Sequence, residues 1–331
     1  MFNGHEICTK YIPAHPPQRQ RVKDGNRTRK KKVVIAPLFR EHADTEQLAY
    51  NLSAFKVGDE VEMTLKMHGT SQRTGYLPVL KKYKRSLIDI LLGRDGKPVY
   101  DWGYVCGTRR TVLDTYDGGF YGSDEFRKQH HERFVGKLAK GEAVYYEIVG
   151  YVNESTPIMP RGRNDKLGKD FVKKYGKETT FSYGCEPGQS DLYVYRMTMT
   201  NEDGDVVEYS PEYMRYRCEQ MGVKAVPFLA KVAIDDEGAF IWKPSYLIGG
   251  VYGEAPDGYG MSVMKLAEYF YDGEDPIGKT HVREGVVCRI TNRPKFTAYK
   301  HKNFSFKVLE GIIKDSADTP DMEEAQEIVD G

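Results

Sequence analysis

The stretch Glu62-Met63-Thr64-Leu65-Lys66-Met67-His68-Gly69-Thr70-Ser71 decides which fold we expect for this chain. Apolar residues alternate with polar ones up to Leu65, which is the two-residue period of a strand with one buried face. Lys66 therefore points away from that face. Gly69 can adopt backbone angles closed to other residues and lets main-chain groups approach a ligand closely. An amine between a strand and a glycine turn suits a covalent nucleophile, although a surface lysine at a strand end would give the same pattern.

Four later segments are also strand-like, and each carries polar groups that packing in a strand does not require. They are residues 144–150, 192–197, 283–289 and 299–307. Their distinctive side chains are Glu147, Tyr195, Glu284, Lys300 and Lys302. Because Lys300 and Lys302 are two residues apart, a strand would place both side chains on one face.

In this order the five segments resemble the motifs of the covalent nucleotidyltransferase superfamily, which contains ATP-dependent DNA ligases, RNA ligases and mRNA capping enzymes. The first segment is most similar to the RNA ligase 2 family, which includes the RNA-editing ligases, because His68 stands where DNA ligases and capping enzymes usually have aspartate. The resemblance covers residues 57–309. It implies an α+β nucleotidyltransferase fold, with antiparallel sheets flanked by helices and a nucleotide cleft between them.

The resemblance assigns the reacting groups. Lys66 would attack the α-phosphorus of ATP and carry AMP, and Lys300 and Lys302 would hold the α-phosphate. A lysine amine is mostly protonated at neutral pH, so Lys66 needs nearby cations such as these two lysines to become nucleophilic. Glu284 matches a glutamate implicated in binding Mg²⁺ or Mn²⁺, which prefer oxygen ligands. His68 would help to pass AMP on to RNA.

The same resemblance assigns the nucleotide contacts. Glu147 would bind a ribose hydroxyl, and Tyr195, or alternatively Tyr193, would stack on adenine. Gly69 would allow the backbone to approach the nucleotide. Arg109 would contact ribose or a nucleic-acid phosphate, with Arg110 as its close competitor. The family often has Glu before the lysine and Asn three residues after the histidine, where this chain has Leu65 and Ser71. Recognition of adenine is therefore expected to differ in detail.

Composition excludes several classes of protein. The chain has 331 residues, with 49 Lys and Arg against 48 Asp and Glu, so its total charge says little about a nucleic-acid partner. Five scattered cysteines lack the spacing of a zinc site and predict reduced thiols. No apolar stretch approaches the length of a membrane span or a signal peptide. We expect a monomer in the cytoplasm of a cell or, for a phage protein, of its host.

The chain divides into three parts. Residues 1–45 would form a basic arm and a first strand, residues 46–310 the nucleotidyltransferase domain, and residues 311–331 an acidic tail or helix. The arm either contacts nucleic-acid phosphate or is a solvated tail, and its cations include Arg27, Arg29, Lys30 and Lys31. Only about twenty residues follow the last motif, so we expect no C-terminal oligonucleotide-binding (OB) barrel of the kind that DNA ligases and capping enzymes carry.

Local patterns predict further elements. Residues 33–39 read as a strand, and residues 44–52, 121–140, 210–221 and 262–271 as helices. Residues 153–188 are rich in Gly, Pro and charge and predict a long loop. His130 and His131 are expected on the surface of their helix rather than at a metal site.

These expectations converge on an ATP-dependent RNA ligase that joins 5′-phosphate and 3′-hydroxyl ends of RNA, as in phage RNA repair. The same chemistry would serve a DNA nick ligase or a GTP-dependent capping enzyme. A different class of protein, a nucleic-acid-binding protein with a degenerate nucleotide pocket, is the remaining alternative.

Overall fold

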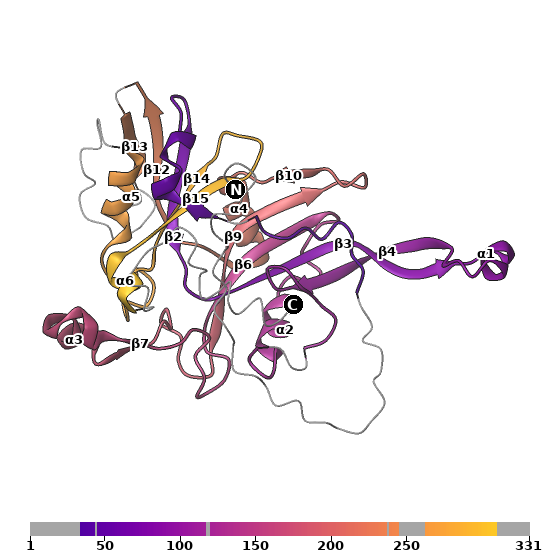
Figure 1. The fold of residues 1–331 in the computed structure, drawn as a ribbon, viewed down its shortest axis with the longest axis horizontal. Helices are drawn as coiled ribbons and strands as arrows, with labels where there is room; N and C mark the ends of the chain where they lie inside the picture. Colours follow the sequence, from indigo (N-terminus) through magenta and orange to yellow (C-terminus); the bar gives the residue numbers. More distant parts are fainter. Residues whose placement is uncertain (1–33, 44, 117–119, 237, 245–261, 310–331) are drawn as a thin grey trace, which may run out of the picture.

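A computed structural model describes residues 34–43, 45–116, 120–236, 238–244 and 262–309 (Figure 1). The predicted contacts of Arg27, Arg29, Lys30 and Lys31, and the predicted acidic tail, lie outside these residues. None of the described helices is long and apolar enough to cross a membrane.

The first sheet has six strands in the order β1-β15-β14-β2-β12-β13. Its neighbours pair antiparallel except for β1 and β15, which are parallel. Helix α5 (Val263–Tyr271) begins at the capping hydroxyl of Ser262 and packs its apolar side against the sheet. The strands are β1 (Glu46–Gln47), β2 (Glu60–Lys66), β12 (Phe228–Asp235), β13 (Gly238–Pro244), β14 (Gly285–Ile290) and β15 (Thr297–Lys302).

The second sheet has seven strands, in the order β10-β9-β6-β3-β4-β5 with β11 added beside β9. Helices α2 (Glu125–Glu132) and α4 (Pro211–Met221) contribute to the largest apolar cluster, which also contains residues of this sheet. The strands are β3 (Thr70–Lys84), β4 (Lys97–Gly107), β5 (Val112–Leu113), β6 (Glu142–Gly150), β9 (Ser190–Thr200), β10 (Val206–Glu208) and β11 (Lys224–Ala225).

Short elements complete the described chain. The outer ends of β3 and β4 project from the body as a long hairpin with α1 at its tip, and α3 lies at the opposite end of the molecule (Figure 1). The short elements are η1 (Leu48–Tyr50), η2 (Leu52–Ala54), α1 (Leu87–Leu91), β7 (Gly162–Arg163), η3 (Asn164–Leu167), α3 (Lys169–Tyr175), β8 (Glu178–Thr179) and α6 (Phe304–Leu309).

The described fold is mixed and its sheets are mainly antiparallel, as the sequence predicts, although β1 and β11 pair in parallel and the helices are few. The helices predicted at residues 210–221 and 262–271 are confirmed as α4 and α5. The loop predicted at residues 153–188 is wrong, because it contains the β7–β8 pair and α3. The four described cysteines are free, in agreement with reduced thiols.

Three local predictions near the N-terminus and the first helix are wrong. Residues 34–43 form no strand; instead Phe39 packs on Leu77 and Val105. Residues 45–52 form β1 and 3-10 turns rather than a helix. The helix predicted at 121–140 is only Glu125–Glu132, and Gly136 takes a left-handed conformation (φ 80°) in the turns that follow.

Two further corrections concern polar residues. The last strand ends at Lys302 rather than continuing to residue 307, because the Asn303 side chain accepts from the Ser305 amide and α6 begins. His130 is buried rather than on the surface, and its Nε2 lies 2.8 Å from Ser190 Oγ. Its neighbour His131 is partly buried and contacts Thr74 through Nδ1.

Replacing Gly69 with alanine should destabilise the fold, because the added Cβ would lie 2.2 Å from the Ile148 carbonyl oxygen. Such overpacking against backbone lowers the free energy of unfolding by about 1–3 kcal/mol. Gly103→Ala is the matched control, since its Cβ would meet only Val79, at 3.2 Å. Thermal unfolding would measure both variants, and equal melting temperatures would contradict the proposed close approach.

Acidification should weaken the fold through His130. Burial, assisted by Arg133, lowers the pKa of His130 to about 4 from its ordinary value near 6.5. The unfolded chain therefore binds a proton first, and stability present above pH 6.5 is lost as the pH falls towards 4, by roughly 3 kcal/mol at most. Urea unfolding at a series of pH values should show a shallower loss for His130→Gln than for the wild type. Parallel curves would argue against this assignment.

Candidate active site

Lys66 lies where the chain passes from one sheet to the other. It is the last residue of β2, and only Met67, His68 and Gly69 separate it from Thr70, the first residue of β3. The side chain of Lys66 is buried, as are those of Glu62 and His68. The two-residue period therefore places Lys66 opposite the apolar core face, as predicted, but that opposite face is the cleft between the sheets rather than solvent.

Buried Arg127 of α2 fixes the start of β3. Its Nη2 donates to Thr70 Oγ1 at 2.7 Å, and its Nη1 donates to the Ser71 carbonyl at 3.2 Å. Asp124 Oδ1 accepts from Nε of the same guanidinium at 3.2 Å. The turn that follows Lys66 is thus held from the outer side of the second sheet.

The floor of the cleft is a grid of side chains from β2, β14 and β15. Lys66, Gly285 and Lys302 lie opposite one another in the first row, and Thr64, Val287 and Lys300 form the second. The third row pairs Glu62 with Arg289 and Ala298. Side chains in cross-strand register share a face, so the grid brings together the predicted Lys66, Lys300 and Lys302.

The second sheet supplies the facing wall. Ser71 of β3, Glu147 of β6 and Tyr195 of β9 line the same pocket as Lys66 and Lys300. Arg109, just beyond β4, also lines it and is buried. The Tyr195 hydroxyl lies 2.8 Å from Ser71 Oγ, which fixes its ring beside the start of β3. The pocket therefore combines cations, a carboxylate and an aromatic ring.

Glu284 sits immediately behind this lining and has no exposed surface. Its Oε1 lies 2.7 Å from Lys66 Nζ and 3.3 Å from Lys302 Nζ. Lys302 is itself buried, and its Nζ lies 5.7 Å from the centre of the Phe306 ring. A carboxylate so close to the amine stabilises the ammonium form of Lys66. The amine becomes nucleophilic only when this carboxylate is engaged elsewhere.

His68 lies beneath the pocket, inside an aromatic cluster. Its ring meets those of Phe181 and Phe306 edge-on, each at 4.7 Å between centroids. Its backbone amide donates to the Tyr183 hydroxyl at 2.7 Å, and its Nδ1 is 3.9 Å from Glu284 Oε2. The geometry thus directs His68 towards Glu284, while its predicted role in passing AMP to RNA stays a prediction.

The remaining predicted residues separate into two groups. Arg110 is exposed, and its backbone carbonyl accepts a hydrogen bond from Arg73. Its side chain is not among those that line the pocket. Of the two alternative tyrosines, Tyr195 lines the pocket, whereas Tyr193 is a buried member of the largest apolar cluster. Arg109 and Tyr195 are therefore the better placed members of the two pairs.

Several pocket residues have no counterpart in the sequence prediction. His42 reaches the pocket from a segment without regular structure, and its ring lies 5.0 Å from that of Tyr195 and 5.4 Å from that of Phe296. Burial, and secondly Arg196, holds the pKa of His42 well below its usual range, so the ring is neutral. Glu62 also lines the pocket, and its carboxylate accepts hydrogen bonds from Nη1 and Nη2 of Arg215 at 2.8 and 2.9 Å. Only the alternation of residues before Lys66 could have indicated Glu62 from the sequence.

A divalent metal fits this site only in one way. No group of three or more His, Cys, Asp or Glu suited to a metal occurs among the described residues. Glu284 offers one buried carboxylate beside the lysines that would hold phosphate. This donor set suits Mg²⁺ or Mn²⁺ held by a single carboxylate together with substrate phosphates and water, rather than by a protein cage.

The solved structures that are similar to this chain include several of an RNA ligase from Naegleria gruberi. The ligase with PPi is 13% identical, has a TM-score of 0.45 and covers 89% of this chain and 63% of that chain. A mutant with ATP and Mn is 15% identical, has a TM-score of 0.44 and covers 85% and 59%. Another mutant, with AMP and Mn, is 13% identical, has a TM-score of 0.45 and covers 85% and 60%.

This chain therefore spans about six tenths of the length of those ligase chains. No protein-family model matches the chain, and no curated protein sequence matches it. TM-scores below 0.5 are too low to assign an activity, so the residues of the cleft have to carry the functional argument.

Glu284→Gln should destabilise the protein, because it leaves the ammonium groups of Lys66 and Lys302 buried beside a neutral amide. Removing one partner of a buried ion pair lowers stability by about 3–5 kcal/mol. Adding Lys302→Met removes one of the two buried charges, so the double variant should lose less than the sum of the single variants. Chemical denaturation would measure this, and strict additivity would show that the carboxylate and Lys302 do not interact.

Proposed function

We propose that this protein is an ATP-dependent RNA ligase that acts through a lysyl-AMP intermediate. The observation that carries the proposal is the convergence of Lys66, Arg109, Glu147, Tyr195 and Lys300 on one pocket. These residues come from five separate segments of the chain. A cation-rich pocket with carboxylates, aromatic rings and a buried amine is suited to a nucleoside phosphate.

The residues that line the pocket indicate where each part of the nucleotide would bind. The α-phosphate would lie between Lys66 and Lys300, where cations neutralise the charge that develops on its oxygens. Glu147 would accept a bond from a ribose hydroxyl, and Arg109 would donate to ribose or phosphate. The ring of Tyr195, fixed by Ser71, would lie against the base.

The first step is nucleotidyl transfer to the amine. Lys66 Nζ, after losing a proton, attacks the α-phosphorus in line, so an N–P bond forms as the bond to the bridging oxygen breaks and pyrophosphate leaves. The ion pair between Glu284 and Lys66 must first be broken. A divalent metal bound there would neutralise phosphate charge and engage the carboxylate.

The later steps consume the adduct. An oxygen of the RNA 5′-phosphate attacks the adenylate phosphorus, which breaks the N–P bond and restores the amine of Lys66. The 3′-hydroxyl then attacks the activated 5′-phosphorus, and AMP leaves as the phosphodiester forms. His68 would influence this exchange through Glu284, and its Nδ1 lies 3.9 Å from Glu284 Oε2. RNA as the substrate follows from the motif resemblance alone, and the cytoplasm as the location follows from the scattered cysteines and the absence of an apolar stretch that suits a signal peptide.

Lys66→Arg should abolish transfer of labelled AMP from ATP by several orders of magnitude, because a guanidinium is a poor nucleophile. The variant keeps a cation beside Glu284, so its melting temperature should stay near that of the wild type. Lys128→Ala, at an exposed cation on α2 that pairs with Glu125, is the control and should label normally. Full labelling of Lys66→Arg would end the proposal.

The same assay separates the alternatives within this chemistry. Incubation with labelled GTP in place of ATP should give no adduct if the protein is not a capping enzyme. Sealing of 5′-phosphorylated nicks in each combination of RNA and DNA strands should require RNA. Efficient sealing of all-DNA nicks would instead identify a DNA ligase.

A further inference from the structure

The hairpin formed by the outer ends of β3 and β4, residues 81–97 with α1 at the tip, is built unlike the rest of the molecule; we name it the arm (Figure 1). Helix α1 has no buried residue, and its apolar side chains are exposed to solvent. Leu87 and Leu91 are each 87% exposed, and Ile88, Ile90 and Leu92 are between 55% and 67% exposed. Nothing in the fold of the described residues therefore requires these apolar side chains.

The tip helix is stabilised locally rather than by a core. Ser86 Oγ accepts from the Asp89 amide at 3.2 Å, and Asp89 Oδ2 accepts from the Ser86 amide at 2.9 Å. This capping box lets the helix form while its side chains stay in water. The apolar surface of the tip is thus held in a defined shape, as a contact surface would be.

Cations surround the tip. Residues 81–97 hold six Lys and Arg against two Asp. Lys84, Arg85, Arg94 and Lys97 line a pocket beside the helix, together with Asp89 and Asp95. Lys82, Lys84 and Lys97 are exposed. The arm consequently carries a net positive charge where the molecule as a whole is nearly neutral.

Strand register shows which face of the sheet carries these cations. Lys97 pairs with Lys84 and Val99 with Lys82, so all four side chains share one face. Along β4 the same face continues through alternate residues to Gly107, which pairs with Arg73. Arg73 shares its face with Ser71, which lines the active-site pocket. The cations of the arm therefore lie on the face of the second sheet that bears the cleft.

Both strands of the arm lead directly to the active site. β3 begins immediately after Gly69, and β4 ends two residues before Arg109. The 15 residues of β3 give it a length of about 50 Å. A polyanion that leaves the cleft on this side of the second sheet would pass over residues 34–39, which pack on Leu77 and Val105, before it meets Lys82, Lys84 and Lys97.

We propose that the arm binds the RNA that flanks the junction, with Lys82, Lys84 and Lys97 on backbone phosphates and the apolar side chains of α1 against the bases. The inference rests on the proposed function. Phosphate contacts position nucleic acid, and apolar wedges of Leu or Ile pack against base steps. Four of the six cations of the arm, Lys81, Lys82, Lys84 and Lys97, lie in the strands rather than beside α1, whereas a membrane surface would need cations only around the tip.

The test uses the full-length protein and a nicked, 5′-phosphorylated RNA duplex. The flanking helix has about 16 base pairs, roughly the span of a double-stranded RNA-binding domain, and a second substrate has half that length. Fluorescence anisotropy over a range of salt concentrations gives both the dissociation constant and the slope of its logarithm against that of the salt concentration.

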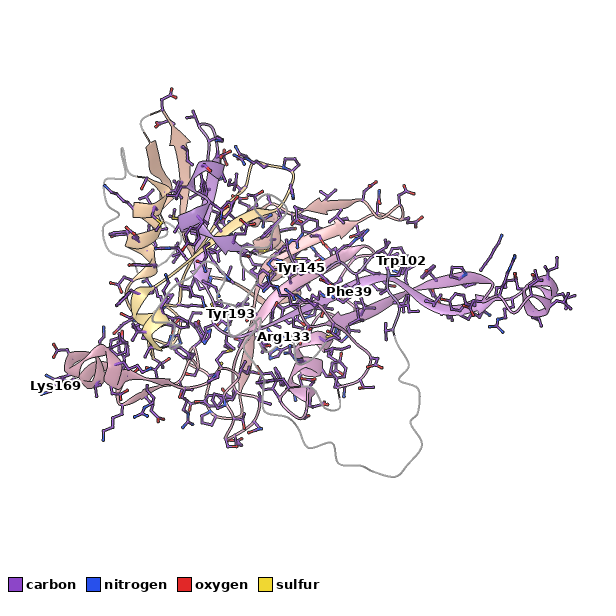
Figure 2. All side chains as sticks on the ribbon, in the orientation of Figure 1. Phe39, Trp102, Arg133, Tyr145, Lys169 and Tyr193 are labelled. Carbon is purple, nitrogen blue, oxygen red and sulfur yellow. The ribbon has the colours of Figure 1, made fainter. Side chains whose placement is uncertain are left out.

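Three groups of variants separate the contributions. The triple variant Lys82→Ala, Lys84→Ala, Lys97→Ala should bind the long duplex about tenfold more weakly and reduce the salt slope by roughly 2–3. The double variant Leu87→Ser, Leu91→Ser should weaken binding without changing the slope. The control Lys169→Ala, Lys173→Ala, Lys177→Ala removes three exposed lysines at the opposite end of the molecule, where Lys169 is visible (Figure 2), and should change neither.

Several results would overturn the inference. One is a salt slope for the arm triple variant equal to that of the control triple variant. Another is an equal loss of affinity for the short and the long duplex. Loss of binding to phosphatidylserine vesicles, or of self-association, in the Leu87 and Leu91 variant with RNA affinity intact would identify a lipid or protein partner instead. Labelling of Lys66 by ATP without RNA should be normal in every variant; its absence in the wild type would refute the proposed function, independently of the salt slopes.

Discussion

The three-residue connection between Lys66 and Thr70 is the constraint on which the rest of the structure depends. It joins the central strand of one sheet to the central strand of the other, so the two sheets are held together at this point. Gly69 makes the connection possible because a side chain there would collide with the β6 backbone. Lys66 consequently lines the same pocket as residues of the second sheet, among them Ser71, Glu147 and Tyr195.

Charge burial follows from the same arrangement. The connection places Lys66 beside Glu284 and Lys302. All three side chains are buried, so the cations have to be paired with a carboxylate. The protein tolerates this cluster because each charge has an opposite partner at short range. Under the proposed function, the shared carboxylate would keep the amine of Lys66 protonated until a ligand enters the cleft and engages Glu284.

Sequence periodicity predicted the part of the site that strands determine. Alternation placed Lys300 with Lys302, and Lys66 opposite Val61, Met63 and Leu65, because a strand fixes which side chains share a face. It did not reveal that β14 lies between β2 and β15, since register between distant segments depends on tertiary packing. His42 was not predicted, because it reaches the pocket from a segment that has no periodicity.

Other failures have separate physical causes. The helix expected over residues 121–140 ends at Glu132, and a left-handed glycine at Gly136 lies in the turns that follow, although Phe134 and Leu138 are buried. His130 read as a surface residue because sequence alone does not show that Ser190 lies beside it. The sequence gives no prediction for the leucines and isoleucines of α1, and only the three-dimensional structure shows that they are exposed.

The continuity of β3 from the lysine turn to the outer hairpin has an evolutionary consequence. A two-stranded ribbon can gain or lose residues in pairs on each strand without reversing the faces on which its other side chains lie. Natural variation could therefore lengthen or shorten this ribbon by about 7 Å at a time while leaving the chemistry at its root untouched. The length of the arm and the residues at the start of β3 can thus vary independently, although both belong to the same strand.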